Sequence, residues 1–290
     1  MSYPTLRLHP RKEESVLRFH PWIFSGAIAS FSAPVEDGDL VSVVDSKGHP
    51  LGTGHFGGGS IAVRLLSFDA EEVIDRAFYK RRLEAALRLR LSCDLVRPVG
   101  SSDSPNTTYR LVHGEGDSLP GLIIDIYDRT AVVQAHSLGM HQARQTIAEV
   151  LWEVFAEAGD PVLPLEGIYY KSETTLPTRD MRELASDGFL IGHTEAAPIY
   201  ENGVRFTPDW LKGQKTGFFI DQRDNRALVA HYAKGRTVLN AFCYTGGFSI
   251  YALHAGAKRV DSLDSSAKAM YLTEQHVALN FGADCPRHHS

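Results

Sequence analysis

One ten-residue stretch combines residue types that belong to different kinds of site. The stretch "NAFCYTGGFS", Asn240 to Ser249, ends an apolar run with a cysteine, two adjacent glycines and aromatic residues. Cys243 could be a nucleophile. Gly246 and Gly247 could cradle an anionic group, because glycines let the backbone of a helix N-terminus approach a ligand closely. The strands and helices that position this stretch help to decide between a nucleophile and an anion-binding turn.

The residues around this stretch predict the opening of a doubly wound parallel sheet. We expect "RTVLNAF" to be a buried strand, "SIYALHAGA" a helix, "KRVDSLD" a second strand and "SSAKAMYLTEQHVALNFG" a second helix. Upstream, "ENGVRFTPD" is typical of a hairpin arm, and "DQRDNRALVAHYA" of a helix capped by Asp221. Ligands bind at the carboxyl ends of the strands in such sheets, which is where the turn Tyr244, Thr245, Gly246, Gly247 and Phe248 falls.

The turn and the acid after the second strand indicate a cofactor of the adenosine type. Asp264, followed by Ser265, closes that strand, where a carboxylate can accept hydrogen bonds from both ribose hydroxyls. T-G-G-F lacks the G-x-G-x-x-G spacing of dinucleotide sites, which disfavours NAD. S-adenosylmethionine has a carboxylate and an amine in place of a pyrophosphate, and is therefore preferred. A tight turn without a ligand is the structural alternative.

The polar segment "GQKTGFFIDQRDNR" enters the sheet next to this turn. It could close over the methionine end of the cofactor, or it could be only a turn that leads into an amphipathic helix. The residues in question are Gln214, Lys215, Thr216, Asp221, Gln222 and Arg223.

The cysteines and histidines are not expected to do chemistry. Cys243 lies at the end of a strand expected to be buried, where a packing role is favoured over a thiolate of depressed pKa. Cys93 and Cys285 have no base nearby, and no His or Cys spacing supports a metal.

Two domains are expected before the sheet. The region from Leu6 to Phe68 alternates extended segments with turns and predicts a small β-rich domain. Glu71–Leu91 predicts a linking helix, whose scattered basic residues favour a solvated surface over an RNA-facing one. A compact α+β domain is then predicted from four strand candidates, "GLIIDIY", "RTAVVQAHS", "GIYYKSE" and "GFLIGHT". A helix lies between the second and third of them, with an apolar stripe at Ile147, Val150, Leu151, Val154, Phe155 and Ala158.

Composition fits an intracellular multidomain protein. The 290 residues allow two or three domains, and the formal charge of −5 excludes a chain coated in positive charge without excluding a local RNA-binding face. No apolar run is long enough for a membrane span, no signal sequence is seen, and the three cysteines are scattered. A cytoplasmic location is expected.

Together these motifs resemble the RlmI-like family of large-subunit ribosomal RNA methyltransferases, which form 5-methylcytosine. The resemblance runs through "HPWIFSGAI", "GTGHFGGGSIAVRLLS", "YRLVHGEGDSLPGLIIDIYD", "GQKTGFFIDQRDNR", "VLNAFCYTGGFSIYAL" and "RVDSLDSS". It implies an N-terminal PUA β-barrel that binds RNA (residues 1–70), a linking helix (71–94), a central α+β domain (95–200) and the start of a Rossmann-like methyltransferase domain (201–290).

The resemblance also implies site residues and partners. The Tyr244–Phe248 turn becomes the first cofactor motif, Asp264 the ribose-binding acid, and Gln214–Arg223 the upstream cofactor-side loop, with S-adenosylmethionine as cofactor and large-subunit ribosomal RNA as partner. Whether the chain forms a homodimer stays open. The family's substrate-side motifs, including the nucleophilic cysteine, would follow Ser290, and none of the three cysteines matches that position. A sheet of two parallel strands cannot bury both faces, so its C-terminal part is expected to be marginal unless it packs on a partner.

Two other classes are weighed against an RNA methyltransferase. An RNA-binding protein without activity would use the PUA domain alone. A dinucleotide-dependent oxidoreductase is disfavoured by the glycine spacing, and binding of NAD would revive it.

Overall fold

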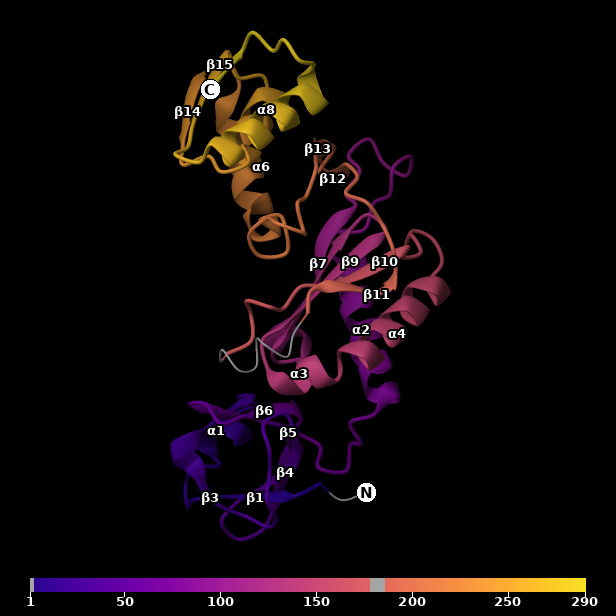
Figure 1. Cartoon of the computed structure of the whole chain (residues 1–290), viewed down its shortest axis with the longest axis vertical. Helices are drawn as coiled ribbons and strands as arrows, with labels where there is room; N and C mark the ends of the chain where they lie inside the picture. The colour runs from indigo at the N-terminus through magenta and orange to yellow at the C-terminus, as the bar shows by residue number, and fades with distance from the viewer. Residues whose placement is uncertain (1–2, 178–185) are drawn as a thin grey trace. The chain divides into compact units, whose positions relative to one another are not determined.

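The computed structural model describes residues 3–177 and 186–290 (Figure 1). The chain divides into two compact units, one of residues 1–94 and 110–194 and the other of residues 95–109 and 195–290. None of the helices in the described ranges is long and apolar enough to cross a lipid bilayer.

The N-terminal part of the first unit is a six-stranded sheet, in the order β2-β6-β5-β4-β1-β3. Pairing is antiparallel except between β1 and β4. Leu6, Val41, Val43 and Val63 form part of a buried apolar core on one face. The elements are β1 (Thr5–Leu8), α1 (Glu14–Leu17), β2 (Trp22–Phe24), η1 (Ser25–Ala27), β3 (Ile28–Phe31), β4 (Leu40–Val44), β5 (Pro50–Phe56) and β6 (Ile61–Ser67). The predicted β-rich domain is thereby confirmed.

A five-stranded sheet forms the rest of the first unit, in the order β11-β10-β9-β8-β7. The parallel pair β9 and β10 is joined through the helices, while β8 and β11 pair antiparallel to it. The predicted stripe on α4 is buried except at Ala158, which follows the helix and is exposed. The elements are β7 (Thr108–His113), η2 (Gly114–Asp117), β8 (Leu122–Tyr127), β9 (Thr130–Ala135), α3 (Leu138–Gln142), α4 (Arg144–Glu157), β10 (Gly167–Tyr170) and β11 (Gly188–Gly192).

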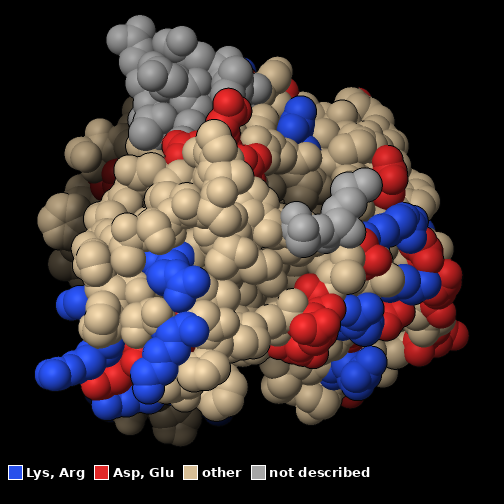
Figure 2. Space-filling view, turned by 90° about the horizontal axis from the view of Figure 1, so that it is seen from below, with Lys and Arg blue, Asp and Glu red and all other residues tan. Residues whose placement is uncertain are grey.

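In the linking helix α2 (Arg76–Ser92), basic side chains form ion pairs with acidic side chains. Arg76 and Lys80 both meet Glu153 of α4, and Arg81 lies 2.8 Å from Glu72. Arg90 is nearly buried and pairs with Asp117. Figure 2 shows Lys and Arg side chains gathered at one edge of the molecule and mixed with Asp and Glu side chains at the opposite edge. Most basic side chains of the helix are therefore paired with acidic partners, and whether the helix faces RNA stays a prediction.

The second unit contains a β-hairpin followed by strands and helices in alternation. β14 and β15 are parallel, as predicted, and a short parallel strand that the sequence did not predict, β16, extends the sheet beside β15. The elements are β12 (Ile199–Glu201), β13 (Val204–Phe206), η3 (Ile220–Gln222), α6 (Arg223–Ala233), β14 (Thr237–Ala241), α7 (Gly247–His254), β15 (Arg259–Leu263), α8 (Ala267–Phe281) and β16 (His288–His289).

Two local predictions for this unit are wrong. Asp221 does not cap α6: it lies within η3, which runs directly into the helix, and Gln222 occupies the cap position without a side-chain hydrogen bond. β14 is not buried on both faces. Leu239 is 69% exposed and Leu263 of β15 is 62% exposed, because no element in the described part of the chain covers that face of the sheet.

Candidate functional site

The turn between β14 and α7 has an unusual backbone. Phe242, Tyr244 and Gly246 all have positive φ, at 59°, 50° and 75°. A Cβ on Gly246 would lie 2.5 Å from Thr273 Cγ2 of α8, so the chain needs glycine there for both conformation and space. The Gly246 N–H donates to the Cys243 carbonyl at 2.9 Å, and α7 begins at the next residue.

Side chains from β15 and α8 fix this turn. The Asp264 carboxylate accepts the N–H groups of Tyr244 and Ser266, each at 2.9 Å. Thr273 Oγ1 donates to the Tyr244 carbonyl at 3.0 Å, and His276 Nδ1 lies 2.8 Å from the Thr245 carbonyl. The two backbone hydrogen bonds hold the pKa of Asp264 below its ordinary value, so the carboxylate is ionised at neutral pH.

A hollow of about 290 Å³ opens beside the turn, at the carboxyl end of β14. It brings together five predicted cofactor residues: Gln222, Tyr244, Thr245, Gly247 and Phe248. Five residues that the sequence analysis did not assign to the cofactor complete its lining: Phe218, Phe219, Arg226, Phe242 and Cys243. The hollow is therefore more aromatic than predicted. The adjacent Phe218 and Phe219 and the aromatic residues of "FCYTGGF" could have predicted this aromatic lining from the sequence.

The other predicted residues lie outside this lining. Asp264 supports the turn through its hydrogen bond to the Tyr244 N–H, and Ser265 follows Asp264 in the chain. Gly246 lies within the turn but does not line the hollow. In the upstream segment, the Gln214 N–H donates to the Tyr244 hydroxyl at 3.3 Å. Lys215 lies 3.3 Å from Asp221 and 4.3 Å from the centroid of the Phe219 ring, and Thr216 is buried. Gln214 and Lys215 thus contact Tyr244 and Phe219, two aromatic residues that line the hollow.

A buried ion cluster lies behind the hollow. Arg226 makes two hydrogen bonds to Glu201, at 2.8 and 2.7 Å, and its guanidinium lies 4.7 Å from the centroid of Phe218. Tyr251 donates to the same carboxylate at 2.9 Å. Arg223, predicted to touch the cofactor, is instead buried in this cluster, with Nε 3.4 Å from Glu201 and Nη2 bonded to the Thr108 carbonyl.

Cys243 packs, as predicted from its place at the strand end. Its Sγ is buried 3.6 Å from Met270 Sδ and 3.9 Å from Thr273 Oγ1. Burial raises the pKa of the thiol, which makes it a poor nucleophile. In the described ranges, no three His, Cys, Asp or Glu side chains gather in a way that could hold a metal ion.

The comparisons with known proteins agree with this geometry. Residues 6–68 match the model of a PUA-like domain, and residues 178–287 match that of an S-adenosylmethionine-dependent methyltransferase. Two separate parts of the chain are thus similar to a PUA-like domain and to a methyltransferase that uses S-adenosylmethionine.

Among curated proteins, the chain is similar to ribosomal RNA large subunit methyltransferase I. It is 39% identical over 277 residues to that protein of Alteromonas mediterranea, covering 94% of this chain and 65% of the relative. It is 40% identical over 280 residues to that of Shewanella denitrificans, covering 95% of this chain and 66% of the relative. The chain therefore spans slightly less than two thirds of the length of these relatives.

Solved structures share the fold. A chain described as a methyltransferase from Streptococcus mutans matches with a TM-score of 0.79 and 23% identity, covering 100% of this chain and 70% of the other. A second methyltransferase, solved in complex with S-adenosylhomocysteine, matches with a TM-score of 0.79 and 22% identity, covering 100% and 69%.

Proposed function

We propose that this chain binds S-adenosylmethionine in the hollow beside Tyr244–Phe248 and acts in the methylation of large-subunit ribosomal RNA in the cytoplasm. The observation that carries the proposal is this hollow, built at the carboxyl end of β14 against the N-terminus of α7, in a chain 39% identical to ribosomal RNA large subunit methyltransferase I.

The residues present fit the cofactor. The N–H groups in the first turn of α7, those of Gly247 and Phe248 among them, have no partner within the helix and suit a carboxylate. Phe219, Phe242 and Tyr244 offer aromatic faces, which attract a cation. The ionised Asp264 accepts one N–H on each oxygen, and a carboxylate oxygen has a further lone pair for a ribose hydroxyl. When bound, S-adenosylmethionine supplies an electrophilic methyl group on its sulfonium.

The remaining residues orient this site. Asp264, Thr273 and His276 hold the turn in its left-handed backbone conformation. The ion pair between Arg226 and Glu201 fixes the wall formed by Phe218.

We assign the acceptor atom as C5 of a cytosine, following the family resemblance. Activation of C5 needs a thiolate that adds to C6 of the base. The buried Cys243 thiol, with its raised pKa, does not meet this requirement. The rival hypothesis is an RNA-binding protein without activity, and a lack of methyl transfer in the assay below would favour it.

Calorimetric titration of the chain with S-adenosylmethionine and with S-adenosylhomocysteine tests the cofactor site. Asp264→Asn keeps the shape of the side chain but removes the charge that would accept from the ribose, so affinity should fall about tenfold or more. Asp261→Asn is the matched control, because Asp261 lies on the strand that Asp264 follows, pairs with Arg259 and, within the described ranges, makes no hydrogen bond to the Tyr244–Phe248 turn.

Equal affinity in Asp264→Asn would remove that residue from the cofactor site, and binding of NAD in place of S-adenosylmethionine would revive the oxidoreductase hypothesis. Thermal denaturation of each variant controls for a loosened turn. Transfer of a labelled methyl group to large-subunit ribosomal RNA, followed by nucleoside mass spectrometry, tests the substrate. Where methyl transfer is detected, the product should be 5-methylcytidine, and its formation would require a thiolate other than that of Cys243.

A further inference from the structure

One face of α8 carries a row of polar side chains that bind the backbone of neighbouring segments. Thr273, His276 and Asn280 are spaced by three and four residues, so they lie on the same face of the helix. Thr273 Oγ1 donates to the Tyr244 carbonyl at 3.0 Å. Asn280 accepts the Arg205 N–H at 2.9 Å and donates to the Arg205 carbonyl at 2.8 Å. The row therefore connects the turn after β14 with the hairpin of β12 and β13.

His276, in the middle of this row, uses both ring nitrogens to bridge two segments. Nδ1 lies 2.8 Å from the carbonyl of Thr245, which lines the hollow beside the turn. Nε2 accepts the Thr207 N–H at 3.0 Å. Thr207 follows β13 and opens the connection to η3, which supplies Phe218 and Phe219 to the same hollow. The imidazole thus joins the turn to the segment that carries these aromatic residues.

These two contacts require one protonation state of the ring. A backbone N–H can only donate, so Nε2 must offer its lone pair to Thr207. A carbonyl can only accept, so Nδ1 must carry the proton that is donated to Thr245. The imidazole is therefore neutral. A second proton, on Nε2, would face the Thr207 N–H, and the ring would have to turn toward the Thr207 carbonyl, which lies 3.3 Å from Nε2.

The surroundings of the ring disfavour a positive charge. His276 is 1% exposed, and its ring packs edge-on against Phe206 with centroids 5.4 Å apart. Phe206 in turn lies 4.9 Å from the Phe218 ring of the hollow. Burial lowers the pKa of His276 and outweighs the two backbone hydrogen bonds, which oppose the shift. A movement of the imidazole would therefore reach both the turn and the aromatic wall.

The titratable groups that face His276 from the elements around it are neutral or have partners of their own. They are Arg205 of β13, Asp209 of the connection, Cys243 of the turn, Tyr251 of α7, and Lys268 and Glu274 of α8. Arg205 donates to a backbone carbonyl of α8, Asp209 pairs with Lys268, and Glu274 accepts a serine hydroxyl. Tyr251 and Cys243 both have raised pKa values and keep their protons. None of these groups is a free counter-charge for a protonated His276.

We infer that His276 is a positioning residue for the cofactor: its neutral imidazole holds the turn against the connection, and protonation of the ring weakens binding of S-adenosylmethionine. The inference rests on the proposed function, since it describes how that site responds to acid. Affinity is complete above pH 6.5, the ordinary pKa of histidine, and falls as the pH drops through the lower pKa of the folded chain. Asp264 stays ionised in this range, because its pKa lies below 3.8.

Calorimetric titration of the whole chain with S-adenosylmethionine between about pH 8 and pH 5 tests the inference. Two variants remove the titration, and each keeps one of the two contacts. His276→Asn places an amide N–H where Nδ1 lies and keeps the bond to Thr245. Its affinity should stay within about threefold of the parent value at the alkaline end and should no longer change with pH. His276→Gln places an amide oxygen where Nε2 lies, so it keeps Thr207 and loses Thr245. Its affinity should be about tenfold lower at every pH.

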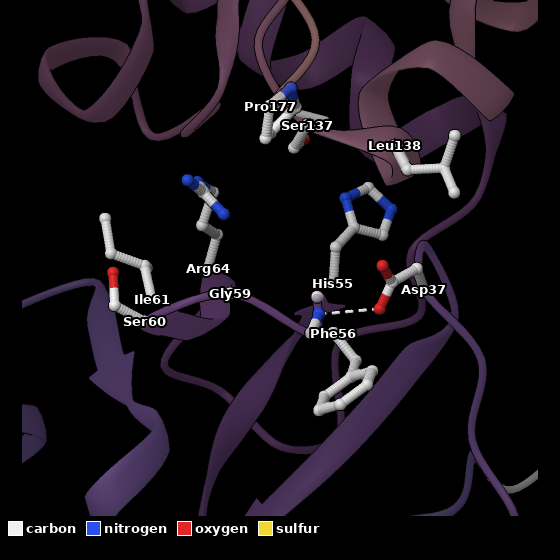
Figure 3. Close-up of a pocket in the computed structure, with 12 residues that line it drawn as sticks. Asp37, His55, Phe56, Gly59, Ser60, Ile61, Arg64, Ser137, Leu138 and Pro177 are labelled. Carbon is white, nitrogen blue, oxygen red and sulfur yellow. Dashed lines mark hydrogen bonds between the residues drawn. The ribbon is translucent and has the colours of Figure 1, made fainter. Parts of the chain in front are cut away.

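A second buried histidine supplies the control. Burial lowers the pKa of His55 to about 4, and a Cβ on Gly139 would lie 2.2 Å from its ring. Its ring lies in a different hollow, in the first unit, together with Arg64, Ser137 and Leu138 (Figure 3). His55→Gln should keep the pH profile of cofactor binding that the parent chain has. Thermal denaturation establishes that each variant is folded at the temperature of the titration.

Nuclear magnetic resonance of the imidazole nitrogens tests the tautomer without any cofactor. At neutral pH the proton of His276 should be on Nδ1, and a proton on Nε2 or a doubly protonated ring would overturn the inference. A merely structural role would give the Asn and Gln variants equal affinities and would leave the loss on the acid side in place in both, which would overturn it as well. Failure of the unaltered chain to bind S-adenosylmethionine at any pH would sink the proposed function and this inference together, whereas binding that neither variant alters would sink the inference alone.

Discussion

At the scale of single residues, His55 links the packing of the first unit to pH. Burial, and secondarily the charge of Arg64, lowers the pKa of its imidazole from 6.5 to about 4. The unfolded chain therefore binds a proton between these two values while the folded chain does not. Protonation of His55 therefore does not reduce the free energy of unfolding above pH 6.5, but reduces it as the pH falls toward 4.

This shift leads to a pH prediction. His55→Gln should flatten the pH dependence of the first unit's stability between pH 6.5 and 4 by about 3 kcal/mol, since one pKa unit corresponds to about 1.4 kcal/mol. Thermal unfolding at several pH values measures it. The exposed His9 supplies the control His9→Gln, which should keep the slope of the parent chain. His136 and His141 also have lowered pKa values, so some slope should persist in both variants.

Gly246 carries a second prediction at this scale. Gly246→Ala adds a Cβ 2.5 Å from Thr273 Cγ2 at a residue with φ of 75°, and should destabilise the second unit by about 2–3 kcal/mol. Gly235→Ala has a similar φ of 72° but open space around its Cβ, so it should cost only the backbone strain of about 1 kcal/mol. Equal losses in chemical denaturation would show that the contact with α8 is unimportant.

At the scale of elements, one carboxylate joins three of them. Glu201 at the end of β12 is fully buried and receives Arg226 of α6 and Tyr251 of α7. Burial, and then the charge of Glu201, raises the pKa of the Tyr251 hydroxyl, so the phenol stays protonated and can donate. The hairpin is thus tied to the helices that form the wall of the cofactor hollow.

Removal of this charge should be costly. Glu201→Gln leaves Arg226 buried without a counter-charge and should destabilise the second unit by about 3–5 kcal/mol. Cofactor affinity should fall with it, because Phe218 and Arg226 line the hollow. The exposed pair of Arg259 and Asp261 offers the comparison: Asp261→Asn should leave the unfolding transition where it is, and a matching loss there would refute the role given to burial.

At the scale of the whole molecule, local patterns predicted the elements better than the contacts between them. The adjacent glycines and the acid after β15 predicted the turn at Gly246, and the apolar periodicity predicted the strands and helices around it. Local patterns could not predict that Glu201 pairs with Arg226 or that His55 packs on Gly139, because each contact joins residues far apart in the chain. The exposed face of β14 was mispredicted because apolar, β-branched composition cannot show whether a covering layer is present.

The ion-paired helix α2 has a consequence for the speed of RNA encounter. Arg76, Arg81 and Arg90 are paired with acidic side chains within the unit, and the chain as a whole carries a formal charge of −5, so this helix contributes little positive field that would draw a polyanion toward it. Association should proceed near the unsteered rate of about 10⁵–10⁶ M⁻¹s⁻¹. Selection among RNA molecules would then depend on residence time, which short-range contacts set.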